Sequence, residues 1–279
     1  MPRHEITYKS AATGRAFDLS GAALFAGMPN SLRGDAWDYK LGYRGMTYSA
    51  RSAGEVAVTV AALDLAEADG LRRACDADVS ALTPGTFSCD GWSQRAYVTG
   101  VEAATVSGGA ATVKLTVALL DGAWRRPTTY EFRPGAGAGQ VGTSHGYDYG
   151  YGYGYSYSAE TSREIEVDSV VPGEFRMIVY GPATRPSVTV AGNRYQVSTD
   201  VPDGGHMVVD SIEGTVTKVT RNGYKTNCLA NASLGAGEGS GSYIFERIPA
   251  GTSTVGFDGS FGWDLTIYVE DGAVPWTSS

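Results

Sequence analysis

Cysteine and histidine are scarce in this chain, and neither residue type is spaced for metal binding. The 279 residues include only three of each: Cys75, Cys89, Cys228, His4, His145 and His206. Because there is no CxxC pair and no HxH or HExxH spacing, we expect no metal site. We expect free and mostly buried thiols, as in proteins made in a reducing compartment. A disulfide between Cys75 and Cys89 is the less favoured alternative.

Other signatures of chemistry are missing as well. The sequence has no GxSxG elbow, no P-loop and no GxGxxG between a strand and a helix, so we expect neither a cofactor nor an enzyme. No apolar run approaches the ~20 residues of a membrane-spanning helix, and we expect no membrane insertion. The N-terminus lacks the regions of a signal peptide, so we expect a protein that stays in its cell or leaves by lysis.

The formal net charge of −8 lies in the second half of the chain. Residues 1–134 carry 14 basic and 14 acidic side chains, which cancel, whereas residues 135–279 carry 8 basic and 16 acidic ones, which leaves −8. No basic face stands out, so we expect no sequence-independent binding of nucleic acid. A neutral first half is compatible with packing against copies of itself.

Glycine and tyrosine are abundant, with 38 and 17 residues, and both are dense between residues 134 and 160. This segment has low complexity and separates two patterned regions, so we interpret residues 134–160 as a linker or loop. The alternative is an adhesive surface, because alternate rings of an extended segment share one side. The candidate contact residues are Tyr147, Tyr149, Tyr151, Tyr153, Tyr155 and Tyr157.

Residues 1–133 are patterned as an α+β unit. A hairpin is predicted over residues 6–19 and a strand around Val56–Val60. A half-buried strand is predicted within residues 35–49, because apolar residues recur there at period two: Trp37, Tyr39, Leu41 and Tyr43. Three more strands are predicted after a helix, near residues 86–90, 94–103 and 110–119, with turns at Asp90-Gly91 and at residues 107–109.

A single helix is predicted from Asp64 to about Leu82, in a stretch of strong helix formers. Asp64 suits the N-cap, and Glu67 follows three residues later, as in a capping box. Pro84 and Gly85 end the helix. The expected buried face has three-four spacing: Leu65, Ala68, Leu71, Arg72, Cys75 and Val79.

Residues 161–279 are patterned as strands throughout. Eight or nine short apolar runs alternate with turn residues, such as those at Gly192-Asn193 and Asn222-Gly223, and one run is Tyr243-Ile244-Phe245. This pattern predicts a β-sandwich or jelly roll without a helix.

Paired carboxylates for glycoside hydrolysis meet in space and not in sequence. The candidates are Asp210, Glu246 and Asp264, for which turn and strand-end positions are the favoured interpretation. Trp263 and Trp276 are suited to stacking on a sugar ring. Because Trp263 alternates with Leu265 and Ile267, we expect Trp263 in the core.

Both halves resemble one family, the distal tail proteins of siphophages. In the first half the resemblance is carried by Thr83-Pro84-Gly85-Thr86-Phe87, Asp90-Gly91-Trp92, Tyr97-Val98-Thr99-Gly100 and Trp124-Arg125-Arg126-Pro127 with Phe132. In the second half it is carried by residues 175–182 (FRMIVYGP), 192–197 (GNRYQV), 209–211 (VDS), 223–227 (GYKTN), 242–251 (SYIFERIPAG) and 262–266 (GWDLT). The match covers nearly all of the chain outside the Gly/Tyr segment.

The resemblance implies a mainly β fold with one helix. Residues 1–133 would be a ring-forming belt domain, residues 134–160 a linker or loop, and residues 161–279 a galectin-like sandwich. It implies a structural role in the virion, reached after assembly in the host cytoplasm. A ring of copies, six in the family, would cap the tail tube and dock the hub or fibre proteins. The alternatives are an adhesin that binds host cell-wall glycan and, less favoured, a cell-wall hydrolase.

Overall fold

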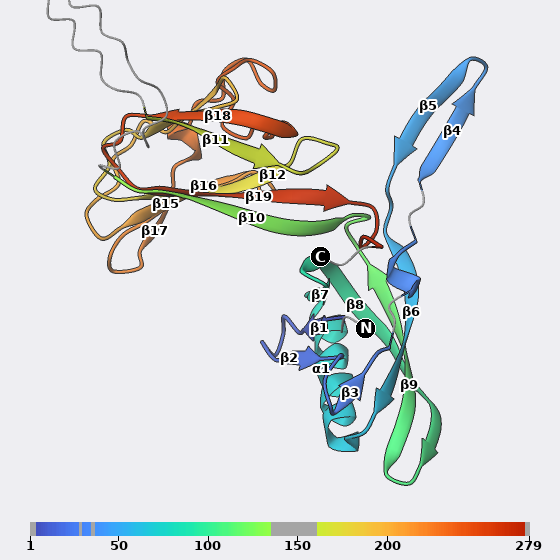
Figure 1. Ribbon diagram of the computed structural model, residues 1–279. Coiled ribbons are helices and arrows are strands. Elements are labelled where there is room, and N and C mark those ends of the chain that lie inside the picture. The colour runs from blue at the N-terminus through green and yellow to red at the C-terminus, as the bar shows by residue number, and fades with distance from the viewer. Residues whose placement is uncertain (1–3, 28–29, 35–36, 135–160, 277–279) are drawn as a thin grey trace, which may run out of the picture. The chain divides into compact units, whose positions relative to one another are not determined.

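The computed structural model describes residues 4–27, 30–34, 37–134 and 161–276. The described chain is mainly β with one α-helix, as predicted (Figure 1). It divides into two compact units: unit 1 holds residues 1–126 and 270–279, and unit 2 holds residues 127–269. The expected domain boundaries after residues 133 and 160 stay predictions.

Unit 1 is built around one antiparallel sheet. Its strands are β1 (Ile6–Lys9), β2 (Ala16–Asp18), β3 (Leu24–Phe25), β6 (Gly54–Ala62), β7 (Gly85–Cys89), β8 (Trp92–Ser107) and β9 (Ala110–Leu119), with the start of β10 (Trp124–Phe132) paired to β8. The order across the sheet is β2-β1-β7-β8-β9-β6-β3. The predicted β1–β2 hairpin is confirmed. So is the β7–β8 turn, in which Asp90 and Gly91 both have positive φ, as a tight hairpin turn requires.

The helix α1 spans Leu65–Ala81, as the sequence predicts. The side chain of Asp64 caps it by accepting hydrogen bonds from the amides of Ala66 and Glu67. The predicted buried face is partly wrong, because Leu65, Arg72 and Val79 are exposed. The helix instead buries Leu71, Ala74, Cys75 and Asp78.

Asp78 sets this orientation of the helix. Its carboxylate is fully buried and accepts hydrogen bonds from the Tyr8 hydroxyl at 2.6 Å, the Ser10 hydroxyl at 2.9 Å and the Ala12 amide at 2.7 Å. A buried carboxylate needs such donors, since an unpaired charge would be strongly destabilising. Burial, together with the bond to Asp78, raises the pKa of the Tyr8 phenol far above its ordinary range. One buried carboxylate thus joins α1 to the β1–β2 hairpin through three hydrogen bonds.

The predicted half-buried strand within residues 35–49 is wrong. The chain forms two strands there, β4 (Asp38–Gly42) and β5 (Gly45–Ala50), which pair only with each other. Every side chain of β4 is exposed, as are all those of β5 except the last. Period-two alternation marks a strand but does not show what covers it. Beside these strands, the guanidinium of Arg51 lies 4.5 Å from the centroid of the Trp37 ring, and the strands themselves stay exposed.

The end of the chain completes unit 1. Ala273 and Val274 are buried, and the amide of Val274 donates to the carbonyl of Leu32 at 3.2 Å. The guanidinium of Arg33 donates to the carbonyl of Trp276 at 2.8 Å. Unit 1 is therefore discontinuous in sequence, since its first and last segments are separated by the whole of unit 2.

Unit 2 is a sandwich of two antiparallel sheets. The larger sheet has the order β17-β16-β15-β12-β19-β10 and the smaller one the order β11-β18-β13-β14. Their bounds are β11 (Thr161–Val167), β12 (Glu174–Tyr180), β13 (Ser187–Val190), β14 (Asn193–Gln196), β15 (His206–Asp210), β16 (Thr215–Val219), β17 (Lys225–Asn227), β18 (Gly251–Phe257) and β19 (Trp263–Asp271).

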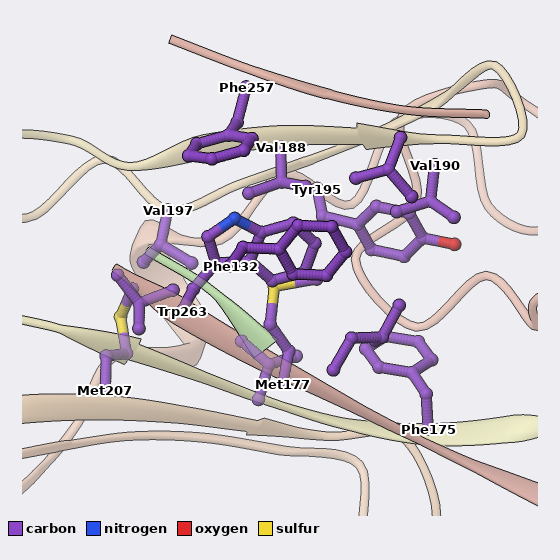
Figure 2. Close-up of a cluster of buried hydrophobic side chains, with 14 of the residues drawn as sticks. Phe132, Phe175, Met177, Val188, Val190, Tyr195, Val197, Met207, Phe257 and Trp263 are labelled. Carbon is purple, nitrogen blue, oxygen red and sulfur yellow. The ribbon is translucent and has the colours of Figure 1, made fainter. Parts of the chain in front are cut away.

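The core of unit 2 lies between these sheets (Figure 2). Trp263 is fully buried, as predicted, and its ring stacks on that of Phe132 with 4.1 Å between centroids. Phe257 meets both rings edge-on. Aromatic pairs in these geometries contribute about 0.5–1.5 kcal/mol beyond their buried area.

The run Tyr243–Phe245, predicted as a strand, is part of a loop. Four glycines before it have positive φ, at residues 235, 237, 239 and 241, so the chain turns repeatedly and does not extend. The side chain of Asn193 holds the loop by bonding to both the amide and the carbonyl of Tyr243.

All three cysteines are free and buried, as predicted. Burial raises the pKa of the Cys75 thiol to about 12, with a further contribution from the nearby charge of Asp78. Burial likewise raises the pKa of the Cys89 thiol to about 12, with a contribution from Asp90.

We expect Asp78→Ala to lower the free energy of unfolding by about 3 kcal/mol, because three donors lose their acceptor inside the unit. Urea unfolding followed by circular dichroism measures this. Asp76→Ala is the matched control: Asp76 lies on the exposed side of the same helix and pairs with Arg72, so its loss should cost less than about 0.5 kcal/mol. Equal effects of the two substitutions would contradict the role given to Asp78.

We also expect the native chain to resist thiol reagents at pH 8. The raised pKa values of Cys75 and Cys89 leave almost no thiolate at that pH, and the thiolate is the reactive form. Titration with a chromogenic disulfide should detect no thiol in the native chain and all three in urea. Fast labelling of the native chain would show that one thiol is open to solvent.

Candidate interaction surfaces

The hairpin of β4 and β5 exposes an unusual number of large apolar side chains. They are Trp37, Tyr39, Leu41, Tyr43, Met46 and Tyr48, which we call the apolar hairpin. Tyr43 at the tip is 98% exposed. In Figure 1 the hairpin projects beyond the helix-covered sheet of its unit. Exposed apolar groups gathered in this way mark an interaction surface.

Apolar side chains lie on both faces of this hairpin. Leu41 is paired with Met46 across the strands, while Tyr39 is paired with Ser49 and Lys40 with Tyr48. Successive residues of a strand point to opposite faces, so neither face is wholly polar. The ammonium of Lys40 lies 5.9 Å from the centroid of the Tyr48 ring. A two-stranded hairpin of this kind is only marginally stable in water, so a partner surface would stabilise it.

Two other strands of unit 1 have an open edge among the residues that the structure describes. On one side β6 pairs with β9 throughout, but on its other side it meets only β3, at Ala61 and Ala62. Beyond Ala96, β8 pairs with β9 alone. Residues 54–60 and 97–107 therefore have backbone groups that face no described strand. Open edges of this length are templates for pairing with another chain.

A groove of about 460 Å³ runs beside the open edge of β6. Phe25 lines it and is half exposed. On the β6 side the lining side chains are short, from Ala57, Thr59 and Ala61. Short side chains allow another strand to approach the backbone closely.

The larger sheet of unit 2 has a cleft of about 420 Å³ at one end, lined by Glu131, Arg133, Tyr180, Phe261 and Asp264 among others. The hydroxyl of Tyr180 donates to the carboxylate of Asp264 at 2.6 Å. This bond, with some burial, raises the pKa of Tyr180 to about 12. The Tyr180 side chain is nevertheless partly open to solvent, with 42% of the residue exposed.

The three candidate catalytic acids are not brought together. Asp210 accepts from the amides of Ile212 and Glu213 in a turn, which confirms the favoured interpretation. Glu246 accepts from the amide of Gly239 at 2.7 Å and lines a different cleft. Asp264 accepts from Tyr180. Asp210, Glu246 and Asp264 therefore do not form the acid pair of a glycoside hydrolase.

Other expected features lie partly outside what the structure describes. No cluster of three or more His, Cys, Asp or Glu residues suited to a metal ion occurs among the described residues. None of their helices is long and apolar enough to cross a membrane. The six tyrosines expected to make adhesive contacts, Tyr147 to Tyr157, lie outside the described residues.

The fold is similar to those of solved phage proteins. A chain in the structure of the phage P2 baseplate in its activated conformation with calcium matches with a TM-score of 0.58 and 13% identity, over 97% of this chain and 99% of that one. A chain in the structure of the same baseplate with strontium matches with a TM-score of 0.58 and 14% identity, over the same shares of the two chains. The Dit protein of phage SPP1 matches with a TM-score of 0.54 and 11% identity, over 96% of this chain and 99% of that one. It is described as a paradigm of the hub adsorption apparatus in phages that infect Gram-positive hosts.

No protein-family model matches the chain, and no curated protein matches it. At 11–14% identity the likeness concerns the fold. It extends over nearly the whole length of each chain, so it covers unit 1 and unit 2 together.

Proposed function

We propose that this chain is a structural subunit of a phage tail tip, a distal tail protein without enzymatic activity. The observation that carries the proposal is the fold, shared over 96–97% of the chain with phage baseplate and hub proteins. Residues 1–133 would act as the belt domain, residues 134–160 as a linker or loop, and residues 161–279 as a galectin-like platform. The protein would reach the virion after assembly in the host cytoplasm.

Copies of the chain would join into a ring, with six as the expected number. A closed ring needs two different surfaces on each copy, so that one copy's first surface meets the next copy's second. Unit 1 offers such surfaces in the apolar hairpin and in the open edge of β6 with its groove. Association would cover apolar side chains and pair backbone groups at once.

The ring would cap the tail tube on one side and dock a hub or fibre protein on the other. Charge supports this role, because residues 1–134 balance 14 basic against 14 acidic side chains. A ring without a basic lining would let DNA pass without holding its phosphates.

A second candidate function, binding of host cell-wall glycan, is favoured by the cleft beside Tyr180 and Asp264.

We expect the full chain to form a ring-sized oligomer, and Leu41→Asp with Met46→Asp to dissociate it. Leu41 and Met46 are 71% and 58% exposed and are partners across the hairpin. Each buried aliphatic side chain contributes about 1.5–3 kcal/mol, or roughly a tenfold to hundredfold change in association. Light scattering after size exclusion measures the mass, and electron microscopy shows the ring.

Val170→Asp is the matched control, since Val170 is 97% exposed but belongs to unit 2. It should leave the oligomer intact. A parent chain that stays monomeric at high concentration would overturn the ring proposal. A Leu41/Met46 double variant that assembles like the parent would remove the hairpin from the interface.

We expect deletion of residues 145–157 to leave the oligomer intact, because the proposed ring surfaces all lie in unit 1. The same light-scattering measurement checks this. Loss of the ring on deletion would assign the tyrosines to assembly.

A further inference from the structure

Four polar side chains from four neighbouring strands form a row across the outward face of the larger sheet in unit 2. The strand order β10, β19, β12, β15 places Glu131, Asp264, Tyr180 and His206 in succession. Tyr180 and His206 are direct partners across their strands, so their side chains share a face. Thr129 and Thr266 are joined through their hydroxyls at 2.9 Å, which puts Glu131 and Asp264 two residues away on a common face.

Next to this row the sheet presents an apolar floor. Ile178 is paired with Val208 on one side and with Asp264 on the other, and both aliphatic side chains are partly exposed. They face outward, because their neighbours along each strand are buried in the core: Met177 and Val179 on β12, and Met207 and Val209 on β15. The face therefore combines flat apolar surface, an open phenol ring and polar groups at the edge.

The row carries both acceptors and donors. One oxygen of Asp264 receives the Tyr180 hydroxyl, and its other oxygen has no hydrogen-bond partner among the described residues. The carboxylate of Glu131 has only a loose ion pair with Arg133, at 3.9 Å, and is largely exposed. The imidazole of His206 adds donor and acceptor capacity. The adjoining cleft of about 420 Å³ falls within the range of small-ligand sites, about 300–1,000 Å³.

We propose that this face is a binding site for neutral sugar chains, an inference that rests on the second candidate function, glycan binding, and specifies its site. Free carboxylate oxygens accept hydrogen bonds from sugar hydroxyls, and bonds to charged groups are the stronger ones. The Tyr180 ring and the aliphatic floor cover the apolar face of a sugar ring. Among the charged residues that line the cleft, the carboxylates of Glu131 and Asp264 outnumber the guanidinium of Arg133, which disfavours an anionic polymer. The cleft is open and lies on a sheet, so a chain can extend beyond it.

The bond between Tyr180 and Asp264 orients both groups for such a ligand. It fixes the carboxylate, so that its free oxygen is already placed when a sugar arrives, and this reduces the entropy lost on binding. It also keeps the phenol protonated, since the pKa of Tyr180 is raised to about 12. Tyr180 acts as the ring platform and Asp264 as the main acceptor.

The test is saturation-transfer NMR on the full chain with glucose, galactose, rhamnose and N-acetylglucosamine and their di- to tetrasaccharides. At least one neutral saccharide should show transfer from the protein. Tyr180→Ala and Asp264→Ala should each weaken its binding by about tenfold. Tyr180→Phe should have a smaller effect, because the ring stays while its hydroxyl is lost.

Glu238→Gln is the matched control, since Glu238 lines a separate cleft of the same unit. It should bind as the parent does, and thermal unfolding should show that every variant is folded. No saturation transfer to any of the saccharides, or equal binding by the parent and Tyr180→Ala, would overturn the proposal. Binding of a basic peptide such as tetralysine, without binding of any saccharide, would also overturn it.

This proposal is independent of the ring. Light scattering of the same samples reports assembly, which depends on unit 1, whereas the saccharide signal depends on unit 2. A chain that assembles but binds no saccharide would refute the glycan site alone. A monomer that binds saccharide would refute the ring alone.

Discussion

Backbone N–H and C=O groups at the edge of a sheet must stay in water or be paired, and unit 1 is organised around this constraint. Its sheet is closed on one side by β3 for only two residues, and β8 extends well past the end of β7. The hairpin of β4 and β5 leads directly toward the open part of β6. The open edge of β6 and the apolar hairpin are thus close in sequence, and the association of copies that we propose would cover both.

Polar contacts inside unit 1 keep this arrangement fixed. The buried Asp78 carboxylate joins the helix to the β1–β2 hairpin, so α1 covers one face of the sheet and the other elements are left for contacts. In unit 2 an apolar core holds the two sheets together, with Trp263 and Phe132 stacked between them. One unit is thus held in part by a buried charge and the other by aromatic packing.

Local signals in the sequence predicted local structure well. The cap at Asp64 and the turn at Asp90-Gly91 were visible because capping and turn geometry depend on neighbouring residues only. The burial of Trp263 followed from strand alternation. The buried role of Asp78 was not visible, because its donors come from residues 8–12, far away in the sequence. The exposure of the 35–49 segment was missed because alternation does not reveal whether the covering surface belongs to the same chain.

The placement of residues 270–276 has a consequence for how the protein is made. The first segment of unit 1 lacks Val274, and with it the bond to Leu32, until the residues of unit 2 have been synthesised. Unit 2 lies between these segments and has all of its strands available earlier. Unit 1 is therefore completed last, and a product truncated before residue 270 would lack its final segment.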